Sequence, residues 1–176
     1  MASGANRRMF WGVVIGVVVL DLITKLLVVR LLPYHMPVRV IGDWVTLQLV
    51  YNQGAAFGIH VGEHSRMVFT GLALLALIVL GAMVRQTDDS HRVRLLALAL
   101  VCGGAVGNLI DRIRSAKGVV DFIDVGINQL RWPTFNVADM AVTCGAITLA
   151  IVLWAEGRDV EEQPPAQEKG TAPAAP

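Results

Sequence analysis

Four long apolar runs constrain the fold of this 176-residue chain more than any other feature. They cover residues 9–32, 67–84, 93–110 and 135–155. Each holds roughly 18 to 24 residues, and at about 1.5 Å per helical residue each can cross a hydrocarbon core about 30 Å thick. The composition, 55% hydrophobic and 16% charged, is that of a membrane protein. We predict an all-α membrane fold, a bundle of four transmembrane helices that places both termini on one side.

The first run follows Arg7 and Arg8, as the apolar part of a secretory signal peptide would. No small-x-small cleavage site comes after it, and the hydrophobicity resumes beyond Lys25 and continues to Leu32. We therefore expect a retained span. The basic residues of the connecting segments are almost evenly divided between the two sides, so the positive-inside rule favours cytoplasmic termini only slightly.

The two segments on the other side are predicted to form a small sheet on the bilayer surface. Pro33 and Pro37 end the first helix. Residues 45–51 alternate between apolar and polar side chains for most of their length, which predicts a strand, and residues 118–125 read as a second extended segment. Trp44 and Tyr51 suit a membrane interface.

Charged side chains inside the runs are expensive and need an explanation. Asp21 and Lys25 are four residues apart, so they share a helical face and can pair. One interpretation is a self-neutralising pair from which Lys25 and Arg30 extend toward the outer surface. The other is a functional role, which is the default hypothesis for ionisable residues within a membrane.

The third run becomes polar near its end. Gly103 and Gly107 are four residues apart and form a small-xxx-small face on which another helix can pack. Asn108 and Arg112 share a face one turn later, which indicates a polar pocket at the membrane edge. The alternative is that Asp111 and Arg112 are simply a polar helix end.

Asp139 lies at the threshold of the last run, where an unpaired charge would be costly. The search for a partner leads to Asp121, and we predict that the two form a catalytic pair that shares one proton. If residues 118–125 form a strand, Asp121 and Asp124 cannot both point into one site. Asn136, three residues before Asp139, also suggests a capping box, a role that is compatible with catalysis.

Three other patterns carry less chemistry. Residues 60–64 match a His-x-x-Glu-His zinc pattern by spacing, but Gly58 and Gly62 break the helix that this site needs, so we expect no metal. Cys102 and Cys144 lie within apolar runs and are predicted to be packing residues. Residues 52–58 contain two glycines and two alanines, which fits either a close approach to a ligand or a tight turn with a buried Phe57.

Taken in order, the motifs resemble the bacterial lipoprotein signal peptidase family, also called signal peptidase II. The resemblance depends on Asp21 with Thr24 and Lys25, on residues 52–57 (NQGAAF), on residues 103–112 (GGAVGNLIDR), on residues 120–123 (VDFI) and on residues 135–139 (FNVAD). Each motif alone is weak, and together they are highly specific.

The resemblance implies an intramembrane aspartic endopeptidase with four transmembrane helices, cytoplasmic termini and an extracytoplasmic sheet that forms a cradle. It implies that Asp121 and Asp139 are the catalytic dyad and that Asp124 lies outside the site. The supporting and substrate-binding residues it implies are Asn52, Gly54, Gly104, Asn108, Arg112 and Asn136, with Asp21 and Lys25 in support.

The implied reaction is removal of the signal peptide from a prolipoprotein, immediately before a cysteine that carries diacylglycerol. One aspartate would take a proton from water while its protonated partner polarises the peptide carbonyl, with no cofactor or metal. The expected partners are these lipid-modified signal peptides and membrane lipids, with no nucleic acid. We expect a monomer in the bacterial inner membrane whose active site lies near the extracytoplasmic face.

Two other functions fit the sequence less well. A proton-coupled transporter could use Asp21, Asp111 and Asp139 as a relay, but four spans without a visible inverted repeat argue against it. A serine protease is disfavoured because no serine lies within an apolar run. Residues 1–158 are predicted to be one membrane domain, and residues 159–176, rich in Pro, Glu and Ala, a disordered cytoplasmic tail.

Overall fold

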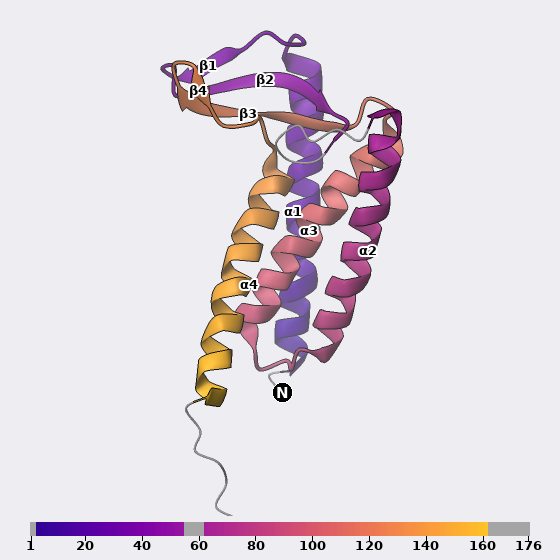
Figure 1. Ribbon diagram of the computed structural model, residues 1–176, viewed down its shortest axis with the longest axis vertical. Helices are drawn as coiled ribbons and strands as arrows, with labels where there is room; N and C mark the ends of the chain where they lie inside the picture. Colours follow the sequence, from indigo (N-terminus) through magenta and orange to yellow (C-terminus); the bar gives the residue numbers. More distant parts are fainter. Residues whose placement is uncertain (1–2, 55–61, 162–176) are drawn as a thin grey trace, which may run out of the picture.

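The computed structural model describes residues 3–54 and 62–161. Figure 1 shows four long helices packed side by side with a small sheet across one end of the bundle. The helices are α1 (Ser3–Leu31), α2 (Ser65–Gln86), α3 (Arg92–Arg114) and α4 (Val137–Glu161). Each contains a stretch that is long and apolar enough to cross a membrane, which confirms the four predicted spans. All four helices are longer than those spans because helical structure continues into the flanking polar residues.

The helices pack around α3, and their shared core lies toward the end that holds the termini. Its buried side chains come from three helices: Phe10 and Val14 of α1, Leu80 and Val84 of α2, and Leu98 and Ala99 of α3. Large apolar side chains on the outside of the bundle, such as Ile15, Ile78 and Ile151, are exposed. This is the distribution expected when lipid tails rather than water surround the helices.

Glycines on α3 allow its neighbours to approach closely. The predicted small-xxx-small face of Gly103 and Gly107 packs against α1, because Cβ atoms added there would meet Val17 and Asp21. A Cβ atom added at Gly103 would lie 2.9 Å from Cβ of Val17 in α1. A Cβ atom added at Gly104 would lie 2.3 Å from the carbonyl oxygen of Ala138 at the start of α4. Gly103 therefore lets α1, and Gly104 lets α4, approach α3 closely at the level where the polar residues begin.

The sheet consists of β1 (Val38–Ile41), β2 (Val45–Asn52), β3 (Val119–Ile127) and β4 (Leu130–Arg131), all antiparallel and in that order. A short 3-10 helix, η2 (Gly62–His64), precedes α2. The strand predicted at residues 45–51 is confirmed as β2, and the segment predicted at 118–125 as β3. A second apolar cluster, formed by Val28, Leu49, Val120 and Phe122, joins the sheet to the end of α1.

The N-terminus, the loop between α2 and α3 and the end of α4 all lie at the opposite end from the sheet (Figure 1). Arg7 holds this end together: it pairs with Asp89 and donates to the carbonyl oxygens of Val84 and Thr87, each at 3.1 Å. The start of α1 and the end of α4 thus lie at the same end of the bundle, as four crossings require. The tail beyond Glu161 lies outside the described residues.

Candidate active site

The start of α4 is fixed by a reciprocal capping box. The side-chain oxygen of Asn136 accepts the backbone N–H of Asp139 at 2.9 Å, and Oδ2 of Asp139 accepts the backbone N–H of Asn136 at 3.2 Å. This confirms the predicted cap. The other carboxylate oxygen of Asp139 accepts a hydrogen bond from Nδ2 of Asn108 on α3, at 2.8 Å. Asp139 therefore caps the helix with one carboxylate oxygen and binds a polar cluster with the other.

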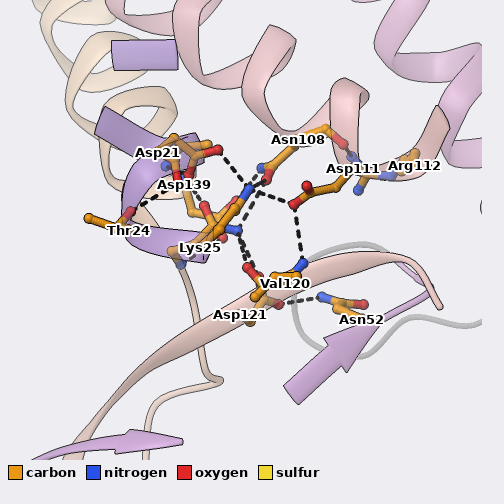
Figure 2. Close-up of polar contacts among 12 residues, drawn as sticks. Asp21, Thr24, Lys25, Asn52, Asn108, Asp111, Arg112, Val120, Asp121 and Asp139 are labelled. Carbon is orange, nitrogen blue, oxygen red and sulfur yellow. Dashed lines mark hydrogen bonds and ion pairs between the residues drawn. The ribbon is translucent and has the colours of Figure 1, made fainter. Parts of the chain in front are cut away.

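Asp121 lies on β3 and points toward the same cluster, as Figure 2 shows. Its carboxylate accepts one hydrogen bond from Nδ2 of Asn136, at 2.7 Å, and one from Nδ2 of Asn52 on β2, at 3.0 Å. Asn136 thus connects the two aspartates, since its amide nitrogen binds Asp121 and its amide oxygen binds Asp139. The antiparallel contact of Phe135 with Ile123 aligns β3 with the start of α4 and so brings these groups together.

The surroundings of Asp121 make its proton hard to lose. Burial and then the charge of Asp139 raise the pKa of this carboxyl group to about 7, although the amides of Asn52 and Asn136 and the charge of Lys25 act to lower it. The Asp121 carboxyl group is therefore poised to gain or release a proton near neutral pH.

Asp124 faces the other side of β3. Both of its oxygens lie 2.8 Å from Nε of Arg131 on β4, and the hydroxyl of Thr46 on β2 donates to Oδ2 at 2.8 Å. The expectation that Asp121 and Asp124 cannot share a site is confirmed, because the strand directs them to opposite faces.

Lys25 lies at the centre of the cluster and is only 3% exposed. Its ammonium is 2.7 Å from Asp21, 2.8 Å from Asp111 and 3.0 Å from the amide oxygen of Asn108. The pairing of Asp21 with Lys25 is confirmed, but the idea that Lys25 extends to the surface is wrong, because α3 supplies two further buried acceptors. The idea that Asp111 is only a polar helix end is wrong for the same reason.

Two other residues of the N-terminal and α3 motifs occupy distinct positions. The hydroxyl of Thr24 donates to carbonyl oxygens of its own helix, at Leu20 and Asp21, and does not enter the cluster. The guanidinium of Arg112 donates to the carbonyl oxygens of Asn108 and Gly54, at 3.3 and 3.4 Å. The predicted polar pocket at the end of α3 is thus present, with Gly54 at its edge.

A cavity of about 770 Å³ opens beside the two aspartates. Its polar end contains Asn52, Asn108, Arg112, Asp121 and Asp139. Its walls are largely apolar and come from two further segments: Trp132, Pro133, Thr134 and Phe135 before α4, and Met140, Val142, Thr143 and Cys144 within α4. A site of this form can hold an extended apolar ligand and present one polar bond to the aspartates.

The sequence did not lead us to predict that α4 forms part of the cavity wall. Cys144 is exposed and lines the cavity, so its assignment as a packing residue is wrong. Thr143 is four residues after Asp139, so the helical period would have placed it on the same side as Asp139.

The predicted close-approach segment after Gly54 falls outside the described residues, as do His60 and Val61 of the zinc pattern. Within residues 3–54 and 62–161, no group of three His, Cys, Asp or Glu side chains is arranged to hold a metal ion.

Comparison with known proteins decides the family. The model of a family described as signal peptidase (SPase) II matches residues 13–155. The chain belongs to the signal peptidase II family. This family is a family of membrane proteases, and the matched range contains every residue of the site described above.

Curated relatives and solved structures agree with the signal peptidase II assignment. The chain is 41% identical to a lipoprotein signal peptidase of Syntrophotalea carbinolica over 142 residues, covering 80% of this chain and 88% of the relative. It is 42% identical to one of Rhodococcus jostii, covering 84% of this chain and 73% of the relative. Two solved structures described as bacterial membrane enzymes superpose with TM-scores of 0.79 and 0.71, at 29% and 30% identity. The superposed regions cover 89% and 82% of this chain, and 93% and 92% of the two solved chains.

Proposed function

We propose that this protein is an aspartic endopeptidase that removes signal peptides from prolipoproteins, cleaving before a cysteine that carries diacylglycerol. The observation that carries the proposal is the connection of Asp121 and Asp139 through Asn136 at the polar end of an otherwise apolar cavity. Membership of the signal peptidase II family supports it, as do relatives that are named lipoprotein signal peptidases.

In this proposal the two aspartates have different protonation states. Asp139 is the ionised partner, because both of its oxygens accept N–H donors and it lies in the first turn of α4, where the helix dipole favours negative charge. Asp121 carries the proton, because burial and the neighbouring charge raise its pKa to about 7.

The reaction then needs only these two groups and water. Asp139 takes a proton from the attacking water as its oxygen bonds to the peptide carbonyl carbon, and Asp121 gives its proton to the carbonyl oxygen. When the C–N bond breaks, Asp139 delivers its proton to the leaving amine, and Asp121 regains a proton from the tetrahedral intermediate. Neither a covalent intermediate nor a metal is needed for this sequence.

The cavity walls support a substrate of the proposed kind. The apolar side chains that follow Asp139 along α4 lead from the aspartates toward the membrane-spanning part of the bundle. A signal-peptide helix can contact these walls while the diacylglyceryl group stays in the surrounding lipid. The scissile peptide bond would then lie at the membrane edge, where water reaches Asp139.

We further propose that the protein works as a monomer in the bacterial inner membrane, with the sheet on the extracytoplasmic side and both termini in the cytoplasm. The separation of the sheet from the start of α1 and the end of α4 supports this orientation (Figure 1). Exported prolipoproteins would meet the site on the side where their mature part emerges.

Cleavage of a diacylglyceryl-modified prolipoprotein by purified protein in detergent, followed by gel shift, tests the proposal. Asp121→Asn and Asp139→Asn keep the size of each side chain and remove its acid–base chemistry, so each should lower the rate by about 10²- to 10⁴-fold or more. Added chelator should leave the parent protein active. A folded variant of either kind that still cleaves at an appreciable rate, or loss of parent activity with chelator, would contradict the dyad.

A further inference from the structure

Asp111 is a buried carboxylate to which the proposed reaction assigns no task. It lies near the end of α3, and its Oδ2 is 2.8 Å from the ammonium of Lys25. The same oxygen accepts the backbone N–H of Val120, at 3.2 Å. Figure 2 shows Asp111 joined by dashed lines to Lys25 and to Val120. Val120 immediately precedes Asp121, so Asp111 holds the backbone next to one of the two proposed catalytic residues.

Asp21 makes a matching set of contacts on the opposite side of Lys25. Its Oδ2 is 2.7 Å from the ammonium, and its Oδ1 accepts the backbone N–H of Ala138 at 2.9 Å. Ala138 immediately precedes Asp139. Each carboxylate therefore binds the same ammonium and also the backbone amide in front of one proposed catalytic aspartate.

Lys25 uses its third hydrogen-bonding position to orient a side chain of the site. Its ammonium lies 3.0 Å from the amide oxygen of Asn108. Because this oxygen faces a cation, the NH2 group of Asn108 must turn the other way, where it donates to Asp139 at 2.8 Å. The ammonium thus fixes which end of the Asn108 amide meets Asp139.

Stability alone does not account for this cluster. Removing three charges from water costs free energy that apolar residues of similar volume would avoid, so buried ion pairs are often no better than apolar packing. Apolar side chains, however, could not bind two backbone amides at defined positions.

We propose that Asp21, Lys25 and Asp111 form a positioning triad that sets the separation and orientation of Asp121 and Asp139. Asp111 fixes β3 at Val120, Asp21 fixes α4 at Ala138, and Lys25 fixes the distance between these two anchors. The proposal rests on the proposed function, because the triad has this task only if the two aspartates react together.

The test compares Asp111→Asn with Asp124→Asn. Both replace a buried, ion-paired carboxylate by an amide of the same size, but Asp124 binds Arg131 on the far face of β3. Asp111→Asn leaves Lys25 its contacts with Asp21 and Asn108, so the protein should fold. We expect kcat to fall by about 10- to 100-fold with KM changed by less than about twofold, because misplacement affects the chemical step more than binding. Asp124→Asn should keep kcat within about twofold of the parent.

The pH dependence of kcat provides a second readout that a purely structural role would not change. The titratable and charged groups around Asp121 are Lys25 from α1, Asp111 and Arg112 from α3, and Asp139 from α4. Removing the negative charge of Asp111 favours ionisation of Asp121, so the alkaline limb of the profile should move to lower pH. The limb should not move in Asp124→Asn.

If Asp111→Asn does not fold, the double variant Lys25→Met, Asp111→Asn replaces it, because it keeps the net charge of the triad and leaves no unpaired ammonium. It should show the same selective loss of kcat. Asp121→Asn is measured beside these variants. If Asp121→Asn is inactive while the triad variant keeps the kcat and pH profile of the parent, the positioning proposal is overturned and the dyad stands. An equal loss of kcat in Asp124→Asn would also overturn it. If Asp121→Asn is active, the proposed function itself has failed.

Discussion

Asp121 and Asp124 lie three residues apart on one strand, and their side chains are almost equally buried, at 3% and 5% exposure. Asp124 is neutralised by Arg131 and receives a further hydrogen bond from Thr46. Among the described residues, Asp121 has no cation in ion-pair contact; it receives two neutral amide donors and faces the charge of Asp139. Burial is therefore common to both faces of β3. The face that holds Asp121 is a candidate active site because the Asp121 carboxyl group can gain or release a proton near neutral pH.

The two faces also differ in the elements that cover them. Residues of the sheet itself, Thr46 from β2 and Arg131 from β4, surround Asp124. The face that holds Asp121 meets the ends of α1, α3 and α4, which bring in Lys25, Asn108 and Asp139. The face of β3 that holds Asp121, the reactive face, thus depends on helix packing. The face that holds Asp124, the structural face, depends only on strand pairing.

Among changes that keep both aspartates, the largest expected effect comes from disturbing the helix packing behind the reactive face. In Gly104→Ala the added Cβ would lie 2.3 Å from the carbonyl oxygen of Ala138, so α3 and α4 must separate. Asn108 and Asp139 would move apart, and we expect the cleavage rate to fall by about 100-fold. Gly81→Ala on α2 is the matched control, since its Cβ meets no atom within 4 Å. Its activity should equal that of the parent in the same gel-shift assay, and equal activity of the two variants would contradict the packing argument.

An intermediate effect is expected on stability, and it should depend on pH only for the reactive face. In the folded protein the pKa of Asp121 is about 7, above its ordinary value of 3.8, so the folded state binds this proton more tightly than the unfolded state. Parent stability attributable to Asp121 is complete below about pH 4 and is lost as the pH rises through about 7.

Asp121→Asn has no carboxyl group at this position, so the variant does not lose this part of its stability as the pH rises. Its thermal midpoint relative to the parent should therefore rise by about 3 to 8 °C between pH 5 and pH 8. Asp124→Asn instead leaves Arg131 without its carboxylate partner and should lower the midpoint at both pH values. Thermal unfolding in detergent measures both, and a pH-independent midpoint difference for Asp121→Asn would contradict the raised pKa.

The smallest effect on stability and activity should come from removing one hydrogen bond on the structural face. Thr46→Val removes the hydroxyl that donates to Asp124 at 2.8 Å, and Arg131 still neutralises the carboxylate. We expect a loss of about 1 kcal/mol in the free energy of unfolding and a cleavage rate within about twofold of the parent. A large loss of cleavage in Thr46→Val would show that the two faces of β3 are not independent.

Local sequence patterns predicted those parts of the molecule that depend on local chemistry. The apolar runs located the four helices because lipid requires long apolar helices, and alternation located β2. The spacing of Asn136 and Asp139 predicted the capping box, because the box involves residues of a single helix turn.

The rest of the site depends on contacts between elements. Helical spacing predicted that Lys25 would pair with Asp21, but only packing of α1 against α3 shows that it also binds Asp111 and Asn108. β4 is only two residues long, too short for a periodic pattern, so the partner of Asp124 could not be predicted. The cavity wall on α4 was overlooked because its apolar residues look like any other part of a span.

If the dyad is correct, Asp121 reacts and Asp124 does not. The most direct test is the cleavage rate of Asp121→Asn beside that of Asp124→Asn, with equal amounts of folded protein and a diacylglyceryl-modified prolipoprotein as substrate. We predict no detectable cleavage by Asp121→Asn and near-parental cleavage by Asp124→Asn. Cleavage by folded Asp121→Asn, or its loss only in Asp124→Asn, would contradict the claim and move the active site to the other face of β3.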